Sequence, residues 1–165
     1  SLPNRRLLFE LLRKSFEFAR RSGTKVGIIY VDLDDFKPIN DRYGHLAGDR
    51  ALVEIAERLQ SVLRASDTVA RVGGDEFVAV LNNVHSRSDV ESAARKVLEI
   101  CDAPLEFLKE PCRIGTSMGI AIYPDDGESL EDLIHYADSA MYTIKRSSKK
   151  GYAFYKKTGS QKTAY

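Results

Sequence analysis

Acidic side chains gather at two places in this sequence. Asp32, Asp34 and Asp35 fill three of four successive positions after an apolar run, and carboxylates so closely spaced repel one another unless a cation lies nearby. A second acidic pair, Asp75 and Glu76, follows two glycines that leave the backbone bare for a ligand. If the two groups meet, their oxygens suit Mg²⁺ shared with substrate phosphates. Taken alone, the first group equally fits a surface turn that binds nothing.

The elements around these carboxylates decide whether they meet. Residues 26–31 form a short, β-branched, unbroken apolar run, which predicts a central strand buried on both faces and ending at Asp32. The Gly73-Gly74 pair lies between two strand-like runs, 68–72 and 77–81, and predicts a hairpin with a tight turn. If the first strand lies beside this hairpin, the two acidic groups converge on one point.

The rest of the chain alternates between helical and extended apolar patterns. Helices are predicted from the start of the chain to Gly23 with Pro3 in the first turn, over 49–63 with an acidic start, from Ser88 or Asp89 to about Ala103, and over 130–144. Further strands are predicted at 105–108, 114–123 and, at a sheet edge, 152–155. This order predicts an α+β fold, a helix-backed sheet with antiparallel pairs.

Composition narrows the class of protein. A chain of 165 residues is about one domain, and 43% hydrophobic with 30% charged residues excludes wholesale disorder. The net charge of +1 gives no bias toward nucleic acid or membranes, so an anionic partner must be held locally. Cys101 and Cys112 fit neither a zinc site nor a disulfide framework, which indicates packing residues in a reducing compartment. A cytoplasmic location is expected, within a parent protein that could be membrane-anchored.

Three motifs resemble one known family. Residues 73–77 spell the signature of the GGDEF domain, the catalytic module of diguanylate cyclases. Residues 32–49 match the family segment D-x-D-x-F-K-x-I-N-D-x-Y-G-H-x-x-G-D throughout, and residues 2–6 resemble the start of the family's first helix. The resemblance covers nearly the whole chain. It implies a nucleotide-cyclase or polymerase-palm fold, with a central mixed, largely antiparallel sheet surrounded by helices.

The resemblance also implies a reaction and a set of site residues. The family condenses two GTP molecules into cyclic di-GMP and two pyrophosphates, with Mg²⁺ or Mn²⁺, at the interface of a homodimer. By position, Asp32, the carbonyl of Leu33 and Asp75 would hold the metal, and Asp75 or Glu76 would accept the proton. Residues at the substrate would be Phe36, Lys37, Asn40, His45, Asp49, Gly73, Gly74, Lys145 and Lys149, of which Asn40 and Asp49 would read the guanine edge.

The chain departs from the family near its carboxyl end. Lys145 and Lys149 are four residues apart in a helical pattern, so both would project toward the GTP β- and γ-phosphates. A solvated basic helix end is the alternative. The family usually has Gly-Arg-Asn after the first lysine, where the ungapped match here gives Ser148-Lys149-Lys150. Because lysine lacks the planar fork of arginine, we expect weaker GTP binding, which Lys149→Arg should improve.

A fourth match concerns regulation. Arg64-Ala-Ser-Asp67 resembles the family's R-x-x-D inhibitory site, which captures the cyclic di-GMP product, and Arg95 on the following helix would be a second contact. An arginine can grip phosphate or guanine with two hydrogen bonds, and an aspartate can accept from guanine N1 and N2. The alternative is an exposed helix end with a surface ion pair.

The resemblance implies a single GGDEF domain over residues 1–165, without its sensor region and with 156–165 as a flexible tail. Its expected partners are GTP, cyclic di-GMP, a second copy and sensor or other domains of the parent chain, with no nucleic acid and no direct membrane contact. A catalytically silent module that holds GTP or cyclic di-GMP is the alternative. A palm-like transferase acting on ATP or nucleic acid is disfavoured by the guanine-reading pair and the neutral charge.

Overall fold

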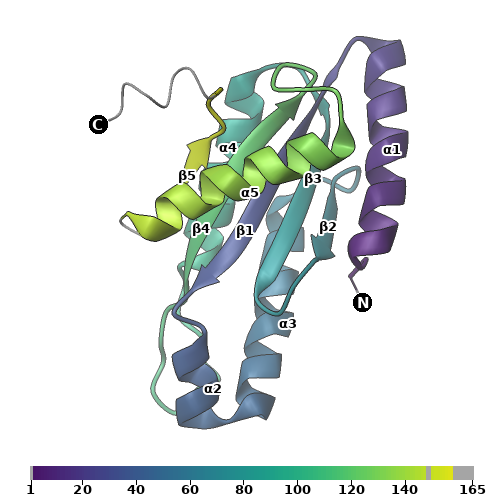
Figure 1. Ribbon diagram of the computed structural model, residues 1–165. Helices are drawn as coiled ribbons and strands as arrows, with labels where there is room; N and C mark the ends of the chain where they lie inside the picture. Colours follow the sequence, from purple (N-terminus) through teal and green to yellow (C-terminus); the bar gives the residue numbers. More distant parts are fainter. Residues whose placement is uncertain (1, 148–149, 158–165) are drawn as a thin grey trace.

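The computed structural model describes residues 2–147 and 150–157, which form five helices and a five-stranded sheet (Figure 1). In chain order the elements are α1 (Arg5–Ser22), β1 (Lys25–Asp34), α2 (Lys37–Tyr43), α3 (His45–Val62), β2 (Thr68–Arg71), β3 (Glu76–Val84), α4 (Arg87–Cys101), β4 (Gly115–Tyr123), α5 (Leu130–Arg146) and β5 (Gly151–Phe154). The strand order is β2-β3-β1-β4-β5. Only β4 and β5 pair in parallel, so the predicted α+β fold with a mixed, largely antiparallel sheet is confirmed.

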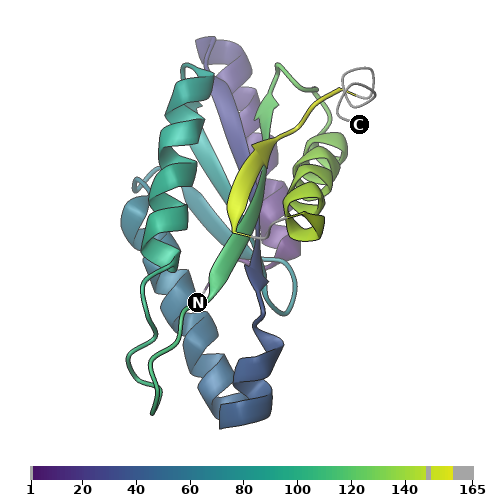
Figure 2. The same ribbon diagram turned by 90° about the vertical axis from the view of Figure 1, so that its left-hand side faces the viewer.

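The sheet separates two apolar layers, and β1 contributes to both because successive side chains of a strand point to opposite faces. Ile29, Val31 and Leu33 pack in the layer that contains α3 and α4. Ile28 and Tyr30 pack in the layer that contains α1 and α5. Figure 2 shows α4 and α5 on opposite sides of the sheet. The alternation therefore directs the side chains of Asp32 and Asp34 toward the α1–α5 layer.

Two helices begin elsewhere than the sequence predicts. α1 starts at Arg5, because the side chain of Asn4 accepts a hydrogen bond from the Leu7 N–H at 3.0 Å and caps the helix. Pro3 therefore precedes the helix instead of lying in its first turn. α3 starts at His45, not Asp49, so its first turn is not acidic.

The start of α4 also differs from the prediction. The helix begins at Arg87, and the Asp89 carboxylate accepts from the backbone N–H groups of His85 and Ser86 at 3.0 and 3.2 Å. Asp89 thus caps the helix from inside its first turn, where a carboxylate also favours the helix dipole. The helix ends at Cys101, two residues before the predicted end.

The predicted strand at 105–108 is wrong. This segment makes a single β-bridge, between Leu105 and Cys112, and otherwise runs as a loop. Its apolar pattern arises because Leu105 and Leu108 are buried in the core. The Arg58 guanidinium donates to the carbonyl oxygens of Ala103 at 2.6 Å and Pro104 at 2.9 Å, which ties the start of this loop to α3.

Two further observations concern the expectations from composition. Cys101 is buried and Cys112 is partly buried, and both are free thiols. Burial raises the pKa of Cys101 to about 12, which is typical of an inert packing residue. No helix within the described residues is long and apolar enough to cross a membrane. The tail predicted at 156–165 lies outside the described residues from 158 onward.

Candidate active site

The two acidic groups meet at one end of the central strands. In the antiparallel pairing of β1 with β3, Asp32 lies directly opposite Glu76. One residue further, the Leu33 N–H donates to the carbonyl oxygen of Asp75 at 3.1 Å. Side chains of directly opposed residues share a face of the sheet, so the Asp32 and Glu76 carboxylates both face the α1–α5 layer. The convergence that the sequence predicts is present in the fold.

Asp32 holds its charge in a poorly solvated position. Only 15% of its side chain is exposed, and its Oδ1 atom is buried with no hydrogen-bond partner among the described residues. Burial raises the pKa of Asp32 to about 6; the positive Lys145 opposes this rise and the negative Asp75 adds to it. An unpartnered carboxylate oxygen with this surplus of negative charge fits a divalent cation.

The ligand set predicted for the metal is compatible with this geometry. Asp32, the Leu33 carbonyl and Asp75 provide oxygen donors only, which is what Mg²⁺ and Mn²⁺ prefer. No group of three or more His, Cys, Asp or Glu side chains in residues 2–147 and 150–157 is arranged to hold a metal ion. Mg²⁺ usually takes one or two protein carboxylates and completes its shell with water and substrate phosphates, so two side chains are sufficient.

Lys145 reaches the same oxygens from the last turn of α5. Its Nζ donates to the Leu33 carbonyl oxygen at 2.8 Å and lies 3.3 Å from Asp32 Oδ2 and 3.4 Å from Asp34 Oδ1. The sequence predicts this lysine at the GTP phosphates, and the structure brings it to the predicted metal ligands. Lys149, the second predicted phosphate ligand, lies outside the described residues.

Asp34, predicted only as one of the three clustered carboxylates, connects the elements around this site. Its carboxylate is almost fully buried; Oδ1 accepts from the Ser117 hydroxyl at 2.7 Å and Oδ2 accepts from the Lys150 N–H at 2.9 Å. It therefore links β1, β4 and the segment that follows α5. The signal was available, because Asp34 is two residues after Asp32 and strand periodicity places both on one face.

Glu76 is held by a partner that the sequence analysis also missed. The Tyr30 hydroxyl donates to Glu76 Oε2 at 2.7 Å. Burial raises the pKa of Tyr30, and the hydrogen bond to Glu76 adds to the rise, so Tyr30 stays a neutral donor. The pKa of Asp138 on α5 is raised by its burial and by the negative charge of Glu76. Tyr30 precedes Asp32 by two residues, which is again the strand period.

The predicted hairpin is present. Its glycines matter because they lack a side chain, not because they adopt unusual backbone angles. Neither Gly73 nor Gly74 lies in the left-handed region. A Cβ atom at Gly73 would lie 3.0 Å from Glu76 Oε2, whereas one at Gly74 would meet open space. The Arg71 guanidinium donates to the Gly74 carbonyl oxygen at 2.8 Å and to that of Gly73 at 3.2 Å, which fixes the loop.

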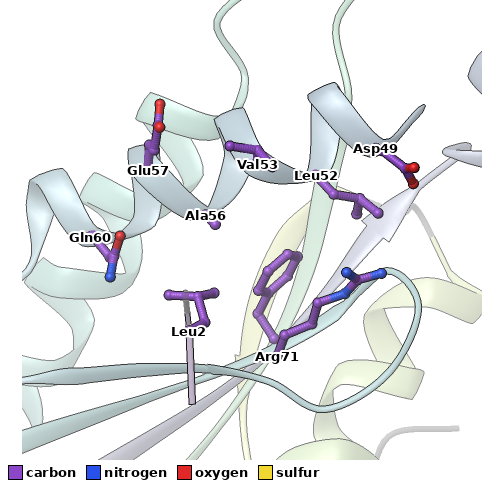
Figure 3. Close-up of a pocket in the computed structure, with 9 residues that line it drawn as sticks. Leu2, Asp49, Leu52, Val53, Ala56, Glu57, Gln60 and Arg71 are labelled. Atoms are coloured by element: carbon purple, nitrogen blue, oxygen red, sulfur yellow. The ribbon is translucent and has the colours of Figure 1, made fainter. Parts of the chain in front are cut away.

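A cavity of about 600 Å³ lies on the α3 side of this hairpin. Figure 3 shows its lining, with Asp49 contributed by α3 and Arg71 by β2; the lining residues are Leu2, Asp49, Leu52, Val53, Ala56, Glu57, Gln60, Arg71 and Phe77. Phe77, which lines the cavity, directly follows Glu76 in β3, so the two side chains point to opposite faces of the sheet. Its apolar walls and few polar groups are typical of a small-molecule site.

The remaining predicted substrate residues cluster where α2 meets α3. Asn40 Oδ1 lies so close above Gly48 that a Cβ there would be 1.7 Å away. Phe36 is buried beside the same glycine, and Lys37 and His45 are exposed at the starts of α2 and α3. Asn40 thus lies against the residue that precedes Asp49, but neither Asn40 nor Lys37 nor His45 lines the cavity.

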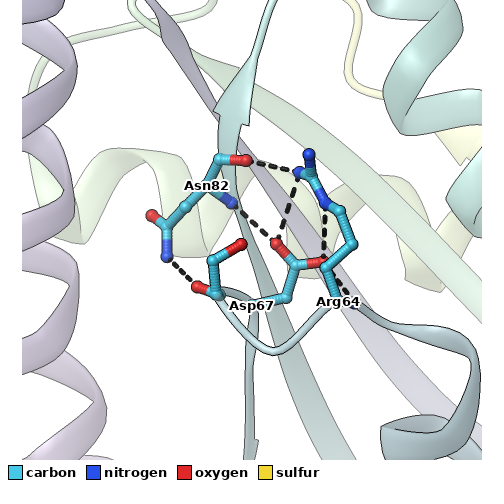
Figure 4. Close-up of polar contacts among 4 residues, drawn as sticks. Arg64, Asp67 and Asn82 are labelled. Carbon is cyan, nitrogen blue, oxygen red and sulfur yellow. Dashed lines mark hydrogen bonds and ion pairs between the residues drawn. The ribbon is translucent and has the colours of Figure 1, made fainter.

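Two of the three predicted inhibitory residues, Arg64 and Asp67, form a compact network with Asn82 (Figure 4). Only 3% of the Asp67 side chain is exposed; Oδ1 accepts from the Asn82 N–H at 3.0 Å and Oδ2 from the Arg64 N–H at 2.9 Å. The Arg64 side chain lies 3.4 Å from the Asp67 carboxylate and remains 56% exposed. Arg95 lies apart from this pair in its contacts, bonded instead to Glu91 at 3.2 Å and to the Tyr152 hydroxyl at 3.1 Å.

Comparison with known proteins assigns this arrangement to a family. The family model described as diguanylate cyclase, GGDEF domain, matches residues 1–151. The chain belongs to the GGDEF domain family of diguanylate cyclases. It is 40% identical over 154 residues to the bifunctional diguanylate cyclase/cyclic di-GMP phosphodiesterase MucR of Pseudomonas aeruginosa, covering 93% of this chain and 22% of MucR. The chain thus spans about a fifth of that relative.

Solved structures share the fold. The crystal structure of the GGDEF domain of TpbB from Pseudomonas aeruginosa superposes with a TM-score of 0.90 at 37% identity, covering 94% of this chain and 98% of that one. The GGDEF domain of DgcB from Caulobacter crescentus, solved in complex with c-di-GMP, gives a TM-score of 0.81 at 26% identity, covering 93% and 91%. The nucleotide-cyclase fold implied by the motifs is confirmed.

Proposed function

We propose that this chain condenses two GTP molecules into cyclic di-GMP and releases two pyrophosphates. One observation carries the proposal: Asp32 and Glu76 lie opposite each other in register, with Leu33 bonded to Asp75 beside them, at a hairpin whose α3 side borders a cavity of about 600 Å³ lined by Asp49. The phosphates of a nucleotide in that cavity would extend past the hairpin to these carboxylates. Named diguanylate cyclases among its relatives support the same reaction.

The carboxylates and one carbonyl would hold the metal. Mg²⁺ or Mn²⁺ on Asp32, the Leu33 carbonyl and Asp75 would neutralise phosphate charge and lower the pKa of the attacking hydroxyl. The unpartnered Asp32 Oδ1 supports this placement, because a buried carboxylate oxygen without a donor is otherwise costly.

The protein's own residues would align and deprotonate the reactants. The 3′-hydroxyl of one GTP attacks the α-phosphorus of the other, and pyrophosphate leaves in line with the attack. Glu76 or Asp75 accepts the hydroxyl proton; the Tyr30 hydroxyl at 2.7 Å fixes the orientation of Glu76. Because each domain would bind one GTP, two copies must face each other, so catalysis requires a homodimer.

Base recognition and phosphate binding would fall to separate groups. Asn40 and Asp49 would pair with the N1, N2 and O6 edge of guanine, with His45 near the same nucleotide and Phe36 at the phosphates. Phosphate contacts would come from Lys37, Lys145, Lys149 and the backbone of Gly73 and Gly74. We place the reaction on the cytoplasmic side, where GTP is available, with input from sensor domains of a longer parent protein.

Product inhibition would act at Arg64, Asp67 and Arg95. The exposed Arg64 guanidinium supports this proposal because it can reach a ligand while Asp67 holds its backbone in place. The complex of DgcB with c-di-GMP shows that a domain of this fold binds the product.

The experiment incubates the full chain with Mg²⁺ and either GTP or ATP and identifies the products by mass. We expect cyclic di-GMP and pyrophosphate from GTP, no condensation of ATP, and loss of product in Asp75→Asn with GTP binding retained. Intact GTP at every protein concentration, with binding retained, would identify a silent binding module instead. Condensation of ATP would overturn the guanine assignment.

A further inference from the structure

Lys145 engages the oxygens that the proposed metal requires. We propose that its ammonium group occupies the metal site before substrate arrives and leaves only when nucleotide phosphates offer it a new partner. Metal and nucleotide would then bind with positive coupling, each weak without the other. This inference rests on the proposed function only for the identity of the metal ligands.

The contacts show that the lysine acts as a cation in this site. Its Nζ lies 2.8 Å from the Leu33 carbonyl oxygen and 3.3 Å from Asp32 Oδ2, which are two of the three proposed metal ligands. Asp34 Oδ1 lies 3.4 Å away and adds a second negative charge. These contacts put the ammonium on oxygens that are assigned to the metal.

The ammonium and a divalent ion cannot share this position. Mg²⁺ binds oxygen at about 2.0–2.1 Å, so an ion on the Leu33 carbonyl and Asp32 would lie within a few ångströms of Lys145 Nζ. The side chains of Lys145 and Asp32 are only 25% and 15% exposed, so little solvent would screen the repulsion. A metal that binds the Leu33 carbonyl oxygen together with the open Asp32 Oδ1 would therefore repel the ammonium from the carbonyl oxygen and from Asp32 Oδ2.

The site can release the lysine without collapsing. Asp34 keeps two other donors, the Ser117 hydroxyl at 2.7 Å and the Lys150 N–H at 2.9 Å. Lys145 lies one residue before the end of α5, and its four-carbon side chain has several rotatable bonds. A triphosphate beside the metal would offer the ammonium a stronger anionic partner.

Thermodynamic linkage turns this exchange into coupling between ligands. The metal alone must break the Lys145 contacts and leave the ammonium without an anionic partner. When nucleotide is present, the phosphates accept the lysine and this penalty disappears. By reciprocity, the metal must strengthen nucleotide binding by the same factor.

The test measures Mn²⁺ binding from the spin-resonance signal of free Mn²⁺, with and without 3′-deoxy-GTP, a GTP analogue that lacks the attacking hydroxyl. The variants are Lys145→Gln and, as a control with the same charge change, Lys150→Gln, whose Nζ pairs with Asp102 at 3.2 Å. Lys145→Gln should tighten Mn²⁺ binding about tenfold without nucleotide and lower the coupling factor by a similar amount, leaving only the coupling that comes from direct contact between metal and phosphates. Lys150→Gln should stay within about twofold of the parent chain. Asp32→Asn should weaken Mn²⁺ binding in either background.

Two results would overturn the proposal. One is a nucleotide-free Mn²⁺ affinity in Lys145→Gln that equals that of the parent chain. The other is equal tightening in Lys150→Gln, which would show a general effect of charge. The proposed function can fail independently. If the chain makes no cyclic di-GMP but Lys145→Gln still tightens Mn²⁺ binding, the proposed reaction is refuted and the exchange of lysine for metal is supported.

Discussion

Asp32 shows a conflict between stability and function at the scale of one residue. Its pKa rises from the ordinary 3.8 to about 6, chiefly because burial disfavours the ionised form. Because the folded state binds this proton more tightly than the unfolded state, Asp32 contributes most to the free energy of unfolding below pH 3.8. That contribution is lost as the pH rises through about 6. Above that range the folded protein carries a buried charge at a cost of up to about 3 kcal/mol.

We therefore predict that Asp32→Asn stabilises the metal-free protein at high pH. At pH 8 the variant should unfold with a free energy about 1–3 kcal/mol higher than the parent chain, and at pH 4 the difference should nearly vanish. Urea unfolding at the two pH values measures this difference, with the exposed Asp41→Asn as control. A variant that is less stable than the parent at pH 8 would contradict the prediction.

Gly74 offers a test of close approach by the substrate. A Cβ there meets open space and its backbone is not left-handed, so Gly74→Ala should fold normally, with a melting temperature within about 2 °C of the parent. We predict at least a roughly tenfold rise in the KM for GTP, because the added methyl would meet the phosphates. Gly73→Ala should instead lower kcat, since its Cβ would lie 3.0 Å from Glu76 Oε2. Unchanged kinetics in Gly74→Ala would remove Gly74 from the site.

The two residues of the inhibitory pair should behave differently. Arg64 is 56% exposed, so Arg64→Ala should relieve inhibition by added cyclic di-GMP with little loss of stability. Asp67 is 3% exposed and accepts from two backbone N–H groups, so Asp67→Ala should cost about 1–3 kcal/mol in unfolding free energy. Inhibition curves and urea unfolding measure the two effects. An Arg64→Ala variant inhibited as strongly as the parent would refute the assignment of this site.

At the scale of secondary structure, the sequence predicts strands better than it predicts short helices and loops. Continuous apolar runs locate β1 and β4 because both are buried on both faces, although β1 does not end at Asp32 as predicted but continues to Asp34. α2 has seven residues, which is too short a segment for an apolar repeat of helical spacing to be recognised. It also lies within a motif whose polar residues obscure such a repeat. The segment 105–108 is apolar because Leu105 and Leu108 are buried in the core. A buried loop of this kind has the same apolar pattern as a strand, although it pairs with no neighbouring strand beyond one bridge.

The candidate site shows the same division. The sequence places Asp32 and Glu76 together, because strand ends and a hairpin determine their positions. It does not predict Tyr30, and it names Asp34 only as a member of the acidic group, because their roles depend on the atoms that they contact across the sheet and after α5. It assigns Lys145 to the phosphates, since a sequence does not show where a long side chain rests.

The packing of α5 on β4 depends on a single glycine. A Cβ at Gly119 would lie 1.9 Å from the Ala137 carbonyl oxygen and 2.2 Å from the Met141 nitrogen, both backbone atoms of α5. Gly119→Ala should therefore displace α5 and lower the unfolding free energy by about 3 kcal/mol or more. Gly127→Ala, with a nearest contact of 3.5 Å, is the matched control. Equal stability of the two variants in urea would contradict this account of the packing.

At the scale of the whole molecule, the proposed reaction needs two copies of the chain. Each copy would carry one acidic cluster and one cavity of about 600 Å³ lined by Asp49 on the α3 side of the hairpin. Each copy would bind and orient one GTP. The 3′-hydroxyl of the GTP on one copy would attack the α-phosphorus of the GTP on the other. The net charge of +1 leaves little long-range repulsion between copies.

The most direct test is the amount of cyclic di-GMP formed from GTP and Mg²⁺ as a function of protein concentration, for the parent chain and Asp32→Asn. We predict that the rate for the parent chain rises with about the square of concentration while the domains are mostly apart, and that Asp32→Asn makes no product at any concentration. A rate strictly proportional to protein concentration down to the most dilute sample would contradict the two-copy mechanism. Product formation by Asp32→Asn at the parent rate would contradict the acidic site itself.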